Sequence, residues 1–240
     1  MSPIGQIFTP LDLAAEIIAA IPALPQCILD PACGTGNLLV AAAVRWPDTQ
    51  LLGFELDSRC VAIARGRLPS ASIQVNDALT LPVKPICDLV IGNPPYAAAH
   101  RSVGDRARLR RQHHTACGSF DLSVPFIERC VGWLRPGGYL ALVVTNKILV
   151  KDYAMKLRSW LQETLVIREI WDLAALPAFW SAKADAAVMI GQRHGSPSGG
   201  VRLVLGRRDG AKDVYHADQL PVGPRGRWEV YVTPAIASLV

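Results

Sequence analysis

The chain has 240 residues, half of them hydrophobic, and a net charge of +5, which suits one large domain or one domain with a fragment of another. No apolar run reaches 18 residues without a charge or a proline, and residues 1–8 lack the pattern of a signal peptide, so we expect no membrane span. Six cysteines without a CxxC pair indicate reduced thiols in a cytoplasmic protein, and no metal site is expected.

Short strands alternate with helices along most of the chain. Helices are predicted at 11–21, from residue 36, and at 57–67, 121–134 and 153–163; strands are predicted at 27–30, 51–55, 72–77, 87–92, 139–144, 166–171 and 185–191. This alternation predicts an α/β fold with a mostly parallel, seven-stranded sheet and helices on both faces. A linker is expected at 194–200, so we place the main domain at 1–193 and a linker with a short extension at 194–240; residues 201–205 of the extension have the pattern of a strand.

Glycine-rich and acidic residues follow the first three predicted strands. The turn Asp30-Pro-Ala-Cys-Gly-Thr-Gly36 joins the first strand to its helix, and Glu55 ends the second strand, 19 residues after Gly36. A carboxylate at that place can accept hydrogen bonds from ribose hydroxyls, and Asp77, at the end of the third strand, can accept from an adenine amino group. The turn has two glycines, not the three of the dinucleotide fingerprint, so a nucleoside ligand without a pyrophosphate fits better.

The fourth predicted strand runs into Asn93-Pro-Pro-Tyr96. An amino group on an aromatic ring or a carbonyl is a poor nucleophile, because its lone pair is delocalised. Asn93 offers a side-chain carbonyl and Pro94 a backbone carbonyl that could together accept both N–H bonds of such a group. Tyr96 offers a face on which a flat base can stack. Alone, the tetrapeptide could equally be a proline-rich turn; with the acids before it, it indicates methylation of a planar amino group.

Most of the net charge lies in segment 100–114, which has five arginines, one aspartate and three of the five histidines. A solvated charged loop is the ordinary explanation of such a segment. Here the segment begins four residues after Tyr96, so its positive field would lie beside the proposed pocket. We therefore expect a polyanionic substrate whose phosphates are held by basic side chains. The candidate phosphate-binding residues are Arg101, Arg108, Arg110 and Arg111.

In this order, the motifs resemble those of γ-class DNA adenine-N6 methyltransferases of type I and type IIG restriction-modification systems. The resemblance covers about 1–192 and includes segments 5–10, 30–36, 76–77, 93–96, 134–147 and 176–188, together with Glu55. It implies a Rossmann-like methyltransferase fold, S-adenosylmethionine as cofactor and double-stranded DNA as substrate. The family uses a recognition domain or a separate specificity subunit, which the 47 residues after 193 do not supply. We therefore expect this chain alone to bind the cofactor but to methylate DNA weakly or not at all.

The resemblance also implies a role for each motif residue. Asn93 and Pro94 would hold the target amino group, Asn93 would also border the cofactor, and Tyr96 and Phe179 would enclose the base. The residues expected to bind the cofactor are Thr9, Asp30, Ala32, Cys33, Gly34, Gly36, Glu55, Asp77 and Asn93. Two simpler explanations stay open, because Thr9 could only cap a helix and Phe179 could belong to the core.

Several other functions share the tetrapeptide or the fold. They are methylation of a glutamine side chain in release factors, methylation of guanine in ribosomal RNA, and methylation of cytosine N4, for which a serine at position 93 would be more typical. An inactive subunit that binds S-adenosylmethionine or DNA is a further alternative. The arginine-rich segment and residues 5–10 and 176–188 favour adenine in DNA.

Overall fold

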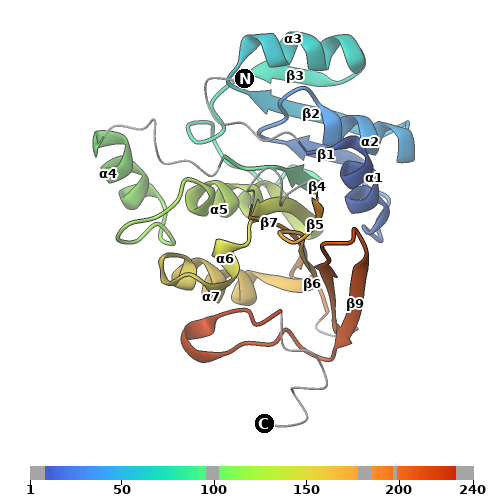
Figure 1. The fold of residues 1–240 in the computed structure, drawn as a ribbon. Coiled ribbons are helices and arrows are strands. Elements are labelled where there is room, and N and C mark those ends of the chain that lie inside the picture. Colours follow the sequence, from blue (N-terminus) through green and yellow to red (C-terminus); the bar gives the residue numbers. More distant parts are fainter. Residues whose placement is uncertain (1–8, 96–102, 178–184, 197–198, 231–240) are drawn as a thin grey trace.

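A computed structural model describes residues 9–95, 103–177, 185–196 and 199–230. Within these residues nine strands form one sheet (Figure 1). The strands are β1 (Cys27–Asp30), β2 (Gln50–Glu55), β3 (Ser72–Val75), β4 (Cys87–Gly92), β5 (Leu134–Thr145), β6 (Leu165–Asp172), β7 (Ala186–Arg193), β8 (Val201–Gly206) and β9 (Lys212–Ala217). The helices are α1 (Leu11–Ala19), α2 (Asn37–Arg45), α3 (Ser58–Arg67), α4 (Val103–Gln112), α5 (Ser123–Trp133), α6 (Lys147–Val150) and α7 (Met155–Thr164), with 3-10 turns η1 (Asp152–Ala154) and η2 (Pro224–Gly226).

The sheet order is β3-β2-β1-β4-β5-β7-β6-β8-β9. The first five strands run parallel to one another, whereas β7 is antiparallel to β5 and β6, and β9 is antiparallel to β8. The chain passes from β1 outward to β2 and β3, and then returns to the other side of β1 as β4. In open α/β sheets, ligands bind beyond the carboxyl ends of the strands at such a reversal.

The predicted α/β fold with a mostly parallel sheet is confirmed, but the predicted count of seven strands is wrong, because the sheet has nine. The additional strands, β8 and β9, both follow residue 193. β8 pairs in parallel with β6, and Val201, Leu203 and Val204 are buried. The cause is tertiary, since β6 would otherwise present an unpaired edge. The domain boundary expected after residue 193 stays a prediction.

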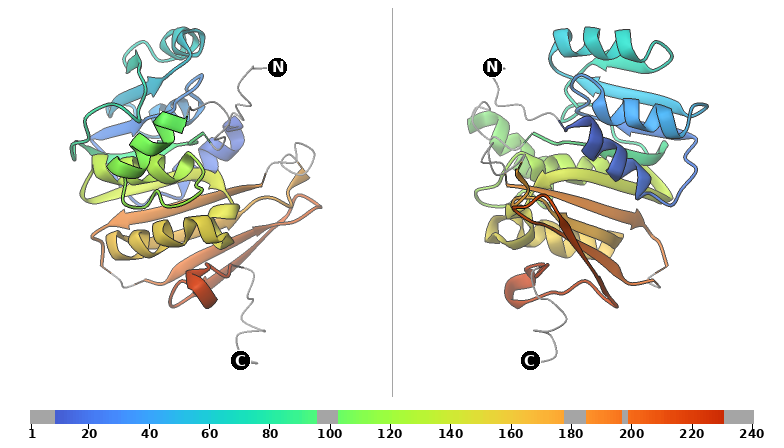
Figure 2. Two further views of the ribbon diagram at one scale, coloured as in Figure 1. Left: turned by 90° about the vertical axis from the view of Figure 1, so that its left-hand side faces the viewer. Right: turned by 45° about the vertical axis from the view of Figure 1, so that its right-hand side comes forward.

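Two apolar layers cover the sheet, one on each face. Helices α1, α2 and α3 pack on one face, to which α1 contributes Leu13 and Ile17. Helices α5, α6 and α7 pack on the other, to which α5 contributes Phe126, Ile127 and Cys130. Figure 2 shows the sheet between these two groups of helices. None of the helices in the described ranges has the length and apolar character needed to cross a membrane.

Three local predictions differ from the structure. Segment 100–114, expected as a loop, contains helix α4, because Arg, Ala and Leu are good helix formers and Leu109 is fully buried in the core. β3 ends at Val75, two residues early, because the Asp77 carboxylate accepts the N–H of Leu79 at 2.9 Å and turns the chain. The strand predicted at 139–144 begins earlier, since β5 starts at Leu134, where its pairing with β4 is irregular.

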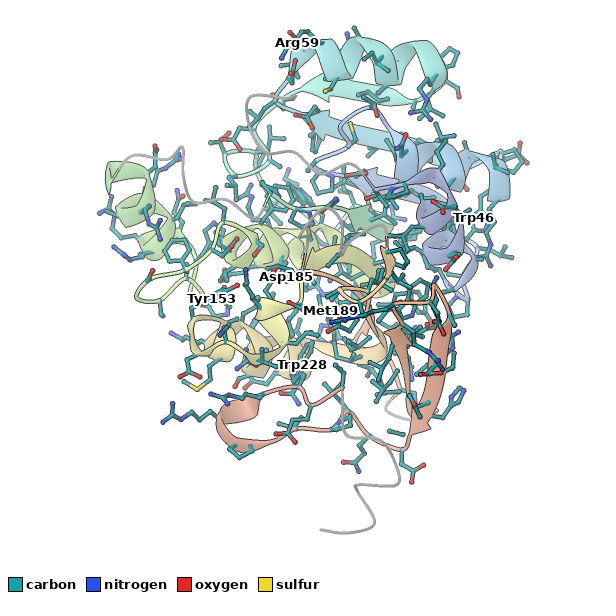
Figure 3. The ribbon with its side chains drawn as sticks, in the orientation of Figure 1. Trp46, Arg59, Tyr153, Asp185, Met189 and Trp228 are labelled. Atoms are coloured by element: carbon teal, nitrogen blue, oxygen red, sulfur yellow. The ribbon has the colours of Figure 1, made fainter. Side chains whose placement is uncertain are left out.

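The last described residues pack against α6 and α7. Trp228 is fully buried, and its backbone N–H donates to the carbonyl of Leu149 at 2.8 Å. Arg158 of α7 is also fully buried, and its guanidinium donates to the carbonyls of Ile148 (2.7 Å) and Gly226 (2.6 Å). Figure 3 shows Trp228 between the body of the molecule and the C-terminal segment. Residues 221–230 are therefore attached to the sheet's helical layer by both apolar and polar contacts.

Candidate active site

The predicted site residues lie on loops at one edge of the sheet. β1 to β4 are parallel, so their carboxyl ends face the same side of the molecule. Asp30 and Glu55 end β1 and β2, Asp77 follows β3, and Asn93 follows β4. The topology thus gathers residues that are up to 63 positions apart in the sequence.

Asp30 is an almost completely buried acid, with 1% of its surface exposed. Its Oδ1 accepts the N–H of Ala32 at 3.0 Å, and a Cβ placed on Gly92 would come within 3.3 Å of the same oxygen. Burial raises the pKa of Asp30 to about 8, and the nearby carboxylate of Glu55 adds to the increase. A cationic group placed beside Asp30 would therefore stabilise its charged form.

Glu55 holds the glycine-rich turn against the loop that follows β2. Its Oε2 accepts the N–H of Gly34 at 3.0 Å, and its Oε1 accepts the N–H groups of Leu56 (2.7 Å) and Asp57 (2.9 Å). A carboxylate has about four acceptor positions, so Oε2 can accept one more donor, such as a hydroxyl.

The turn itself depends on glycine. Gly34 and Gly36 have φ values of 52° and 86°, in the left-handed region that favours glycine. Gly36 caps α2, and a Cβ there would lie 3.3 Å from Cβ of Ala64. The Cys33 thiol is buried, and burial raises its pKa, so it remains protonated and serves packing, not nucleophilic attack.

Asp77 lies just beyond β3, as the first residue of a turn. It is half-buried, and besides accepting from Leu79 its carbonyl accepts the N–H of Thr80 at 2.9 Å. The apolar Leu56, next to Glu55, is 62% exposed. A large apolar side chain exposed beside a polar site can pack against a flat ring. Nothing in the local sequence separates Leu56 from a core leucine, so the sequence did not indicate it.

Asn93 is connected to the glycine-rich turn through Thr9. Its Nδ2 donates to Oγ1 of Thr9 at 3.3 Å, and the carbonyl of Thr9 accepts Nδ2 of Asn37, the first residue of α2, at 2.8 Å. Thr9 is 6% exposed. Its hydroxyl therefore makes a buried contact with Asn93 that a helix cap would not require.

The loop after β4 is described only in part. Pro94 is buried and Pro95 is exposed. Tyr96 and Phe179, the expected aromatic residues of the base pocket, and Arg101 lie outside the described residues. Their placement in the site stays a prediction.

The arginines of α4 have different surroundings. Arg106 and Arg110 lie over the ring of Phe120, at 5.1 Å and 5.7 Å from its centre. Arg106 also donates to the carbonyl of Phe120 (2.8 Å), and Arg110 to that of Gly118 (2.7 Å). Arg108 forms an ion pair with Asp105 at 3.7 Å, whereas Arg111 is exposed in the last turn of the helix. Part of this charge therefore attaches α4 to the loop that follows it.

The sequence did not indicate two residues that support the turn. Asn37 contacts Thr9, as described above, and Arg67 of α3 donates Nη1 to the carbonyl of Thr35 and to Oδ1 of Asn37, both at 2.7 Å. A polar residue directly after the second glycine could have suggested Asn37. No local signal could have identified Arg67, which is 30 positions further along the chain.

Two family models match the chain. Residues 84–179 match the model described as Eco57I restriction-modification methylase, and residues 28–115 match the model described as Methyltransferase domain. The first range includes Asn93, and the second includes Asp30 and Glu55. The resemblance to restriction-modification methylases is thus confirmed over residues 84–179, and residues 28–115 are similar to methyltransferase domains.

Known relatives are longer than this chain. Type II methyltransferase M.BanIII of Aneurinibacillus aneurinilyticus is 29% identical over 185 residues, which are 66% of this chain and 31% of the relative. Type II methyltransferase M.XhoI of Xanthomonas vasicola is 34% identical over 106 residues, or 44% and 19% of the two chains. A trans-aconitate 2-methyltransferase of Methylobacterium radiotolerans is 29% identical over 136 residues, or 56% and 44%. The chain spans less than half of each.

Solved structures have the same fold. A modification subunit assigned to a type I restriction enzyme of Vibrio vulnificus has a TM-score of 0.68 at 15% identity, covering 94% of this chain and 58% of that one. A class I S-adenosylmethionine-dependent methyltransferase of Listeria monocytogenes has a TM-score of 0.67 at 20% identity, covering 81% and 63%. The chain therefore has the Rossmann-like fold of these two structures.

Proposed function

We propose that the chain transfers the methyl group of S-adenosylmethionine to the exocyclic N6 amino group of adenine in DNA. The observation that carries this proposal is the hydrogen-bonded connection from Asn93 through Thr9 to Asn37. It joins the loop expected to hold the acceptor nitrogen to the helix that begins at the glycine-rich turn. Direct transfer needs these two sites side by side, with fixed relative geometry.

The acids at the sheet edge suit the parts of the cofactor. Glu55 has an acceptor position on Oε2 for a ribose hydroxyl, and Leu56 offers apolar surface to the adenine. Asp30 is a buried acid whose charged form a neighbouring cation would favour, as the positively charged methionine end would provide. Asp77 would accept from the adenine amino group. These roles would leave Cys33 as a packing residue.

Asn93 and Pro94 would prepare the acceptor nitrogen. The bond from Asn93 Nδ2 to Thr9 orients the amide, whose acceptor is Oδ1. Pro94 is buried, and its carbonyl belongs to a stretch in which proline rings restrict the backbone. Two acceptors on the amino group would withdraw its lone pair from the ring and share the positive charge that develops during transfer. When bound, the cofactor supplies the activated methyl group.

DNA is the proposed substrate because residues 84–179 resemble restriction-modification methylases and because helix α4 is basic. An adenine inside a duplex is not accessible, so it would be flipped out, with Tyr96 and Phe179 enclosing it. Arg111, with Arg101 and Arg108, would contact phosphates, which position the duplex without reading its sequence, whereas Arg110, also expected to bind phosphate, would instead hold α4 to Gly118. A further domain or a specificity subunit would select the site, and the protein would act in the cytoplasm.

A small carboxylic acid is the second candidate substrate. The specific observation in its favour is the match to trans-aconitate 2-methyltransferase over 136 residues. Methylation of a carboxylate would not need amide and carbonyl acceptors, which repel a negatively charged oxygen. Asn93 and Pro94 therefore favour an amino group.

The decisive experiment offers methyl-labelled S-adenosylmethionine with, in parallel, duplex DNA, RNA, a release factor and trans-aconitate. Of the four substrates, we expect only DNA to be labelled, and weakly. The label should be recovered as N6-methyladenine after digestion of the DNA to nucleosides. Label on cytosine, guanine, glutamine or trans-aconitate, and none on adenine, would refute the proposal in favour of that substrate. Cofactor binding without any transfer, even with a specificity subunit added, would indicate an inactive binding subunit.

Asn93→Ala tests the assigned role directly. We expect transfer to fall by about 100-fold or more, because a preorganised acceptor is lost, with the Kd for S-adenosylmethionine little changed. Gln50→Ala is the matched control, since Gln50 is an exposed amide at the opposite end of β2. Equal transfer by the Asn93 variant and the control would remove Asn93 from the mechanism.

A further inference from the structure

A second polar cluster lies at the same edge of the sheet, one strand beyond Asn93. It consists of Asn146, Lys147, Asp172 and Asp185, which stand at the carboxyl ends of β5 and β6 and at the start of β7. None of these four residues has a part in the proposed chemistry. Helix α6 begins with Lys147, and Figure 3 shows Asp185 beside this helix. We refer to the four residues as the β5–β7 clamp.

One end of the connection between β6 and β7 is held by Asp172. This carboxylate is 4% exposed; its Oδ1 accepts the N–H of Ala174 at 2.9 Å, and its Oδ2 accepts Nδ2 of Asn146 at 3.3 Å. The N–H of Leu173 donates to the carbonyl of Ala186, on the neighbouring strand, at 2.9 Å. The chain that leaves β6 is thereby attached to both β5 and β7.

The other end is held by the same turn after β5. The N–H of Asn146 donates to the carbonyl of Asp185 at 2.8 Å, and Lys147 Nζ forms an ion pair with Asp185 Oδ2 at 2.8 Å. Asn146 therefore contacts both described ends of the 173–185 connection, and Lys147 contacts the end at Asp185. The Lys147 and Asp185 side chains are about half exposed, at 54% and 45%.

The clamp is in register with the proposed acceptor site. β4 and β5 are parallel neighbours, and Gly92, directly before Asn93, pairs with Leu142. Thr145 ends β5 three residues later, so the turn 145–147 and the Asn93 loop leave the sheet at the same edge. A shift of the turn would move the ends of the 173–185 connection relative to Asn93.

We propose that Asn146 and Lys147 act as positioning residues during methyl transfer: they hold the ends of the connection between β6 and β7 that the structure describes, residues 173–177 and Asp185, at the same edge of the sheet as Asn93. This inference rests on the proposed function. Stability alone explains the cluster poorly, because a buried carboxylate such as Asp172 loses hydration that an apolar pair of similar size would not lose. Polar partners instead define one arrangement of the three strand ends, since each hydrogen bond has a required direction.

The test uses Lys147→Ala, Asp185→Ala, the double variant, and the exchanged pair Lys147→Asp with Asp185→Lys. Lys151→Ala is the control. Lys151 is an exposed lysine close to Lys147 in the chain, and the substitution keeps its backbone carbonyl, which accepts from Arg158. We expect each single variant to lower kcat for methyl transfer about tenfold, since small misplacements at a reacting centre are costly. The Kd for S-adenosylmethionine should stay unchanged, the double variant should be no worse than either single one, and the exchanged pair should recover activity.

Amide hydrogen exchange gives a readout that does not depend on turnover. The N–H groups of Leu173, Ala174 and Asn146 should exchange faster in Lys147→Ala than in Lys151→Ala, because the clamp opens locally. An active wild-type chain whose clamp variants all keep normal rates and normal exchange would overturn the positioning role alone. A wild-type chain that methylates no adenine even with a specificity subunit added would overturn the proposed function and this role with it.

Discussion

At the scale of single residues, Asp30 shows that a residue of a binding site can lower the stability of the folded protein. The carboxyl group is buried between the ends of β1 and β4, and the one hydrogen bond described for its side chain, from Ala32, does not offset the loss of hydration. Its pKa of about 8 means that the folded protein without a ligand favours the neutral acid at pH 7. A cation in the cofactor site would reverse this preference, so binding of the cofactor and ionisation of Asp30 are linked.

Asp30→Asn is expected to stabilise the cofactor-free protein at alkaline pH. The folded-state pKa of about 8 exceeds the ordinary value of 3.8, so the folded state keeps a proton that the unfolded state has lost, and wild-type stability falls as pH rises from about 4 to 8. Asparagine can still accept from Ala32 and has no charge to bury. Urea unfolding should therefore show the variant more stable by at least about 2 kcal/mol at pH 9, with a much smaller difference at pH 5, because one pKa unit corresponds to about 1.4 kcal/mol.

Cofactor affinity provides the second half of this test. The same variant should bind S-adenosylmethionine at least about tenfold more weakly, since it lacks the charge that a cation would favour. A stability gain that does not change with pH would contradict the neutral buried acid, and unchanged cofactor binding would separate Asp30 from the site.

At the scale of elements, helix α4 combines an attachment role with a surface charge. Arg110 is occupied by Gly118 and Phe120, whereas Arg111 is exposed one position later. Cation–ring contacts and hydrogen bonds to carbonyls hold a helix in place, while an exposed arginine can approach a phosphate.

Arg111→Ala should weaken duplex DNA binding and leave stability unchanged. Loss of one phosphate contact should reduce the slope of log affinity against log salt by about one, whatever the DNA sequence. Fluorescence anisotropy over a salt series measures this, with Lys84→Ala as control, because Lys84 is an exposed charge just before β4, at the opposite edge of the sheet. Arg110→Ala should instead lower the melting temperature. Identical salt slopes for the Arg111 and Lys84 variants would argue against a role of α4 in binding DNA.

The segment after β9 offers a second prediction at this scale. Arg158→Met should lower the free energy of unfolding by about 3 kcal/mol, because several carbonyls lose a charged donor. Glu163→Gln, an exposed change on the same helix, should have little effect in the same urea titration. A similar small effect for both variants would mean that residues 221–230 do not depend on Arg158.

At the scale of the whole molecule, the sheet continues well past the part that carries the motifs. β8 pairs with the edge of β6, and β9 pairs with the edge of β8. Trp228 is buried in the same apolar layer as α5 and α7. Deleting residues 194–240 should therefore yield a protein that aggregates or unfolds at lower temperature than the 1–230 chain, since the edge of β6 becomes unpaired. Circular dichroism melts of the two chains decide this, and equal melting temperatures would support an independent domain that ends at residue 193.

Much of the candidate site was predictable because its signals are local. The turn from Asp30 to Gly36, Glu55 and Asn93 follow short apolar runs, and the carboxyl ends of parallel strands meet at one edge whatever the details of packing. Where the local sequence misled, a competing interaction was responsible: the Asp77 side chain ended β3 early, and the burial of Leu109 made a helix of a segment that looked like a loop. Leu56 and Arg67 were missed, since their exposure and contacts depend on the folded chain.

By itself, the sequence determined the α/β class, the succession of the first seven strands along the chain and the chemical nature of the groups that follow the first four of them. Periodicity and turn residues carry these signals, because they act over a few positions. Only the tertiary structure decided that β8 and β9 join the same sheet, that Thr9 connects Asn93 to Asn37, and that Asn146 and Lys147 hold two distant segments together. These arrangements depend on contacts between residues far apart in the chain. Such contacts form only when burial of the whole core offsets the entropy of bringing them together.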